Sequence, residues 1–208
     1  MTGTQMSPRI NQSIREGLRV SQTSLAWTMF AGAGAIAVGV LGNSLVLIAF
    51  GAIGLLDAVG SGSLITHFRH ARRHEAISEL HERRALIVVT IGMATIGLAT
   101  IGDSVYRLSA HTASDPLPAG IALAGASVLM LTLLASRKRR IARRIPSHAL
   151  HADGWLSAMG AVLALIALAG TGLDAAFGWW WIDSLAAIAV GCGAIGLSTV
   201  LARGPHPT

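Results

Sequence analysis

Long apolar runs separated by short polar segments dominate the chain. Crossing a bilayer takes roughly 20 helical residues at 1.5 Å of rise each, and six of the runs are long enough. They cover about 24–42, 44–66, 85–102, 117–136, 153–173 and 179–202. The pattern therefore predicts an all-α integral membrane protein with six transmembrane helices. The segment DSVYRLSAHTASDPLP is expected to be a polar connection between the third and fourth of them.

The composition supports this interpretation. Of the 208 residues, 52% are hydrophobic and 12% are charged, which is too apolar for an ordinary soluble domain. The single cysteine, Cys192, excludes an internal disulfide and a dithiolate metal site within one chain. We expect residues 1–20 to form a cytoplasmic tail without a signal peptide, 21–203 the transmembrane domain, and 204–208 a short C-terminal tail.

The basic residues indicate how the chain is oriented. They lie in the N-terminal tail, in the connections at 67–84 and 137–144, and at Arg203, while Arg107 stands apart from them. Because positive charge marks the cytoplasmic side, we expect both termini and both basic loops in the cytoplasm. The expected location is the plasma (inner) membrane. The net charge of +6 follows from this topology and requires no nucleic acid, although the 137–144 run could touch anionic lipid.

Two acids fall within the expected spans, where a carboxylate costs on the order of 3 kcal/mol and is a candidate functional group. Asp57 lies near the middle of the second span, and a hydrogen bond to Ser61 is the alternative reading. Asp153 lies about one turn inside the fifth span, with Ser157 one turn deeper on the same face. Capping of the helix start is the alternative for Asp153. Four other acids are expected to be solvated, at outer ends or in loops: Asp103, Asp115, Asp174 and Asp183.

Histidines are concentrated after the second span. If 67–84 continues that span as one helix, His67, His70, His74 and His81 share an arc of roughly 60° at 100° per residue. Neutral imidazole is a favoured ligand of zinc and its neighbours, and Glu75 beside the stripe could add an oxygen ligand. An interfacial helix that carries histidine only because it is polar is the alternative, and the spacing leaves both open.

Several of these features together resemble the cation diffusion facilitator family of divalent-metal/proton antiporters. They are the six-span order, the acid in the second span, SHALHADGWLSAMGAVLALIALAG in the fifth and FGWWWIDSLAAIAVGCGAIGL in the sixth. The resemblance covers about residues 15–202 and is closest to a short bacterial branch that lacks the family's cytoplasmic C-terminal domain. It implies a homodimer that exchanges metal for protons. The implied transport site has two acids four apart on the second helix, and a His or Asp plus an Asp four apart on the fifth.

Carried over by position, that transport site is incomplete in this chain. Its four positions fall at Ile53, Asp57, Leu156 and Gly160, and only Asp57 can bind a metal. Asp153 matches an acid just before the site. The spacing of the first three histidines of the stripe matches a second, loop-borne metal site of the family.

The expected function is therefore divalent metal transport of zinc-like ions, such as Zn, Co, Mn, Fe or Cd, by metal/proton antiport out of the cytoplasm. The alternative is a non-transporting partner subunit or metal sensor that retains the fold. No cofactor is expected, and no enzyme, because the sequence has no nucleophile–base pair, phosphate loop or HExxH motif. The candidate metal ligands are Asp57, Asp153, Ser157, His67, His70, His74, Glu75 and His81.

The topology can be tested with cysteine labelling in intact cells. A cysteine at Thr112 should react with an impermeant thiol reagent from outside, and one at Ser78 should not, because the basic segments face the cytoplasm. Cys192 is replaced in both variants to remove background labelling. The opposite pattern would invert the topology.

The histidine stripe can be tested by counting bound zinc. Replacing His70 and His74 together with alanine should lower the zinc bound per protein at neutral pH, because two imidazole ligands are lost. In the wild type the same zinc should leave as the pH falls through about 6.5, where histidine protonates. Unchanged zinc stoichiometry in the double variant would mean that the stripe is only an interfacial face.

Overall fold

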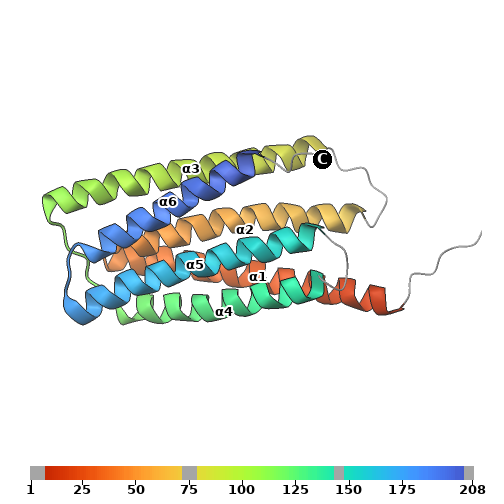
Figure 1. Ribbon diagram of the computed structural model, residues 1–208, viewed down its shortest axis with the longest axis horizontal. Helices are drawn as coiled ribbons and strands as arrows, with labels where there is room; N and C mark the ends of the chain where they lie inside the picture. The colour runs from red at the N-terminus through yellow and green to blue at the C-terminus, as the bar shows by residue number, and fades with distance from the viewer. Residues whose placement is uncertain (1–7, 72–78, 143–147, 204–208) are drawn as a thin grey trace, which may run out of the picture.

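A computed structural model describes residues 8–71, 79–142 and 148–203, with side chains at 19–59, 62, 87–141 and 154–202. These residues form a bundle of long antiparallel helices, which confirms the all-α prediction (Figure 1). Within the described part, five segments have the length and hydropathy to cross a membrane, and α2 contains a shorter apolar stretch. The helices are α1 (Pro8–Leu41), α2 (Leu45–Ala71), α3 (Glu79–Ala110), α4 (Pro118–Ala142), α5 (His148–Phe177) and α6 (Ile182–Arg203).

The bundle has two chemically different ends. At the basic end α1, α3 and α5 begin and α2, α4 and α6 end, so both termini of the helical chain lie at this end (Figure 1). At the opposite end, here called the turn end, are the connections 42–44, 111–117 and 178–181. This arrangement agrees with the charge pattern of the sequence. Which end faces the cytoplasm stays a prediction.

The helices extend beyond the apolar runs that predicted them. The third was expected to end at 102, but α3 continues to Ala110, so the first half of the expected polar connection is helical. Arg107 stabilises this extension, because its Nε donates to Asp103 at 3.0 Å and its Nη1 donates to the Asn43 carbonyl at 2.7 Å. In the same way α4 continues to Ala142, so the part of the expected 137–144 loop that the structure describes is helical. Hydropathy identifies the segment that is embedded in lipid, whereas the helix itself can extend beyond that segment.

The expectation of one helix across 67–84 is wrong. α2 ends at Ala71, and α3 begins at Glu79 and runs back antiparallel to it (Figure 1). His81 therefore belongs to α3 and cannot share a helical face with His67 and His70 on α2.

Two pairs of helices approach each other through glycine. A Cβ atom on Gly97 of α3 would lie 2.7 Å from the Gly191 carbonyl oxygen on α6. A Cβ atom on Gly51 of α2 would lie 2.5 Å from the Gly32 carbonyl oxygen on α1. Contacts this short exclude any side chain, so α3 packs on α6 and α1 on α2 at backbone distance. Small residues commonly allow such close association in membranes.

A buried carboxylate organises the turn end. Asp183, in the first turn of α6, is 3% exposed and accepts hydrogen bonds from Ser44 Oγ at 2.6 Å and from the Leu45 amide at 2.8 Å. It therefore caps the N-terminus of α2, where a negative charge also meets the positive end of the helix dipole. Asp174, 5% exposed, accepts a hydrogen bond from the Ser114 hydroxyl. The prediction that these two acids are solvated is wrong, because neighbouring helices cover them.

Removing the Asp183 carboxylate should destabilise the bundle strongly. Asp183→Ala leaves a buried hydroxyl and a buried amide without their acceptor, which should lower the free energy of unfolding by roughly 3 kcal/mol in detergent micelles. Asp103→Ala is the matched control, since Asp103 is 45% exposed in its ion pair with Arg107 and should cost less than about 1 kcal/mol. Equal losses in the two variants would contradict the capping role of Asp183.

Candidate cation site

A cavity lies in the middle of the bundle. It offers about 40 Å³ to the centres of water-sized molecules, which is room for a few of them. Residues of each of α1 to α6 line it, so a movement of any of these helices would change its shape. The lining residues are Trp27, Thr28, Ala31, Gly32, Phe50, Ile53, Gly54, Asp57, Met93, Leu131, Leu156, Ser157, Gly160, Leu163 and Leu197.

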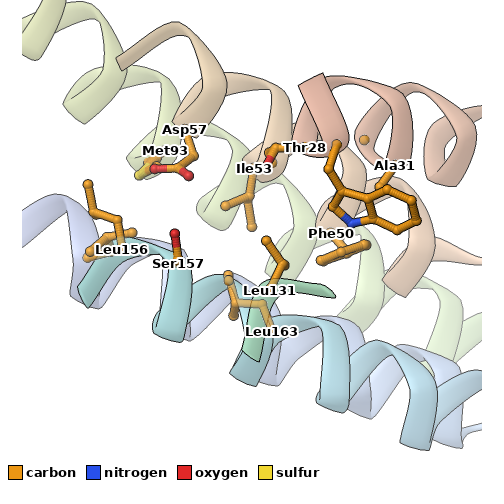
Figure 2. A pocket seen from close by; sticks show the side chains of 15 residues that line it. Thr28, Ala31, Phe50, Ile53, Asp57, Met93, Leu131, Leu156, Ser157 and Leu163 are labelled. Carbon is orange, nitrogen blue, oxygen red and sulfur yellow. The ribbon is translucent and has the colours of Figure 1, made fainter. Parts of the chain in front are cut away.

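Polar groups face one another across this mostly apolar cavity. In Figure 2 the Asp57 carboxylate extends from one wall and the Ser157 hydroxyl points toward it from the facing wall. Asp57 is half-buried on α2, and Ser157 is buried on α5. Thr28 also lines the cavity, as does Trp27, whose buried Nε1–H finds no acceptor among the described residues. The cavity thus combines one carboxylate with hydroxyl groups and an N–H donor.

The four positions implied by the family resemblance converge on this cavity. Ile53 and Asp57 on α2, and Leu156 and Gly160 on α5, all line it. The four positions that the resemblance assigns to a transport site thus line one cavity, and they supply a single carboxylate. Zinc prefers about four ligands, so Asp57 would need ligands that these three neighbours cannot provide.

Ser157, a predicted metal ligand, already has a cationic partner. Its Oγ accepts a hydrogen bond from Lys138 Nζ at 2.9 Å. A divalent ion on Ser157 at an ordinary metal–oxygen distance would lie within about 5 Å of this ammonium group. Repulsion between the two would be roughly 7 kcal/mol at an effective dielectric constant of about 20. Ser157 can therefore serve as a ligand only after the Lys138 ammonium group has left it.

The other predicted ligands lie toward the basic end. Asp153 is in the second turn of α5, which begins at His148, so it is not the N-cap of this helix. His67 and His70 belong to the last two turns of α2 and His81 to the first turn of α3, helices that pack together. Their metal binding stays a prediction.

Two of the predicted ligands, His74 and Glu75, lie outside the described residues. Among the side chains that the structure describes, no three His, Cys, Asp or Glu groups lie close enough to hold a metal ion.

Lys138 is the site residue that sequence reasoning missed, because it stands in the basic run 137–144 and was assigned to a loop. The signal was the helical period. Lys138 follows Leu131 by seven residues and Leu134 by four, and all three are buried on the same face of α4. Extending that helix past 136 would have placed the lysine on the inner face.

Membrane-length helices around a central cavity that contains an acid at membrane depth define this chain as a multi-pass membrane transport protein. The family model described as the cation efflux transmembrane domain matches residues 22–203. The chain therefore belongs to the cation diffusion facilitator (cation efflux) family, which is a family of cation transporters. The comparison with curated proteins gave no match.

Proposed function

We propose that the protein transports a divalent, zinc-like metal ion through the central cavity, with Asp57 as the ionised ligand. The observation that carries this proposal is the convergence of Ile53, Asp57, Leu156 and Gly160 on one cavity, because an acid stands at one of the family's ligand positions. Water and the hydroxyl groups of the lining would complete the coordination sphere. The weak ligand set favours low affinity over tight binding.

Proton exchange follows from the chemistry of the same carboxylate. A metal ion and a proton compete for the Asp57 oxygen atoms, so binding of one releases the other. If the site opens alternately to the two sides of the membrane, this competition gives metal/proton antiport. By the family resemblance the direction is export from the cytoplasm, the active form is a homodimer, and the location is the plasma membrane.

A second candidate function is a non-transporting partner subunit or metal sensor. Two observations favour it. Three of the four ligand positions are Ile53, Leu156 and Gly160, which offer no metal ligand, and Ser157 is held by the buried Lys138. In this case the histidines at the basic end would bind metal without any ion crossing the membrane.

Reconstituted vesicles with an internal pH indicator separate these functions. An imposed zinc gradient should drive proton movement through the wild type, and Asp57→Asn should reduce it to the background of empty vesicles, because an amide keeps the shape but cannot exchange a proton. Asp103→Asn is the matched control and should retain the flux, since Asp103 is exposed near the turn end.

Either of two results would contradict the transport proposal. One is a wild-type protein that moves no protons with zinc, cobalt, manganese, iron or cadmium, and bound zinc in the same sample would then indicate the sensor. The other is an undiminished flux in Asp57→Asn, which would place the exchanging group elsewhere.

A further inference from the structure

Lys138 is a buried ammonium group between three helices. It lies near the end of α4, is 1% exposed, and donates from Nζ to Ser24 Oγ on α1 and to Ser157 Oγ on α5, both at 2.9 Å. Its neighbours Arg137 and Arg140 are exposed. Lys138 is thus turned into the bundle, whereas Arg137 and Arg140 of the same basic run are exposed.

The surrounding residues are shaped for this side chain. Gly154 on α5 faces the stem of the lysine, and a Cβ atom there would lie 3.4 Å from Lys138 Cβ and 3.3 Å from Arg139 Cγ. The missing side chain lets α4 and α5 approach closely enough for Nζ to reach Ser157. The lysine is therefore held by packing along its stem as well as by hydrogen bonds at its head.

A lysine inside a membrane bundle is costly and commonly marks a functional path. Here the ammonium group shares Ser157 with the cavity, because this serine both accepts the Lys138 hydrogen bond and lines the cavity opposite Asp57 (Figure 2). The positive charge therefore stands beside the space that the proposed cation enters. Attraction by Asp57 and repulsion by Lys138 act on the same ion.

We infer that Lys138 is a specificity-determining residue that acts as a tethered cation, holding Ser157 in competition with the transported ion. The inference rests on the proposed passage of a cation through the cavity. While the ammonium group is hydrogen-bonded to Ser157, this serine is not available as a ligand for a divalent ion. The positive charge of the lysine also repels that ion. Entry of that ion requires the lysine head to leave, which weakens divalent binding relative to a site with a neutral residue at 138.

The test measures Co²⁺ affinity of the full chain in lipid nanodiscs by calorimetry at one fixed pH. All samples carry His70→Ala and His74→Ala, so that the signal reports the central site. Lys138→Met keeps the apolar stem, and Lys138→Gln keeps a donor for the two serines. Each should bind Co²⁺ at least roughly tenfold more tightly, because a neighbouring positive charge is gone.

Three further variants make the result specific. Lys138→Arg retains the charge and should stay within about threefold of the parent, whereas Arg140→Met removes an exposed charge that solvent screens and should change affinity by less than about twofold. Adding Asp57→Asn to Lys138→Met should abolish the gain, which places the tighter binding in the cavity.

The possible outcomes separate this inference from the proposed function. If the parent binds Co²⁺ through Asp57 and both neutral variants bind equally well, the role of Lys138 is overturned and the transport proposal stands. If no variant binds Co²⁺, both are overturned. If Lys138→Met does not fold, the Co²⁺ affinity of Lys138→Gln alone tests the role of Lys138. A tenfold gain in a neutral variant that Arg140→Met does not reproduce supports the tethered cation.

Discussion

The bilayer interior offers no hydrogen-bond partners, so a charged group inside this bundle is stabilised mainly by partners within the protein. Two contacts meet this constraint at opposite ends. At the turn end the Asp183 carboxylate binds the N-terminus of α2, and at the basic end the Lys138 ammonium group binds serines of α1 and α5. Together they tie α2 to α6 and α4 to α1 and α5.

Two pairs of helices contact each other at backbone distance through glycine. α1 and α2 touch at Gly32 and Gly51, and α3 and α6 touch at Gly97 and Gly191. Each pair is packed too closely for one helix to slide far along the other, because a small shift would bring larger side chains against the backbone.

The cavity brings together the four positions that the family resemblance assigns to a transport site. Three of these positions, Ile53, Leu156 and Gly160, carry no metal-binding side chain, and the Lys138 ammonium group donates to the neighbouring Ser157. A cation that enters this space as proposed meets the attraction of the Asp57 carboxylate and the repulsion of the Lys138 ammonium group. Selectivity would then depend on electrostatics more than on coordination geometry.

The sequence by itself determined the all-α membrane fold, the family, and Asp57 as an acid at membrane depth. Hydropathy and helical period are local properties, so they locate spans and assign residues to faces. Helix ends were poorly predicted, because polar residues such as those of 103–110 continue a helix outside the lipid. Tertiary structure decided that Asp183 and Lys138 are buried. Whether a polar residue near the end of a span meets solvent or a partner depends on which helix packs against it, and only the folded bundle determines that.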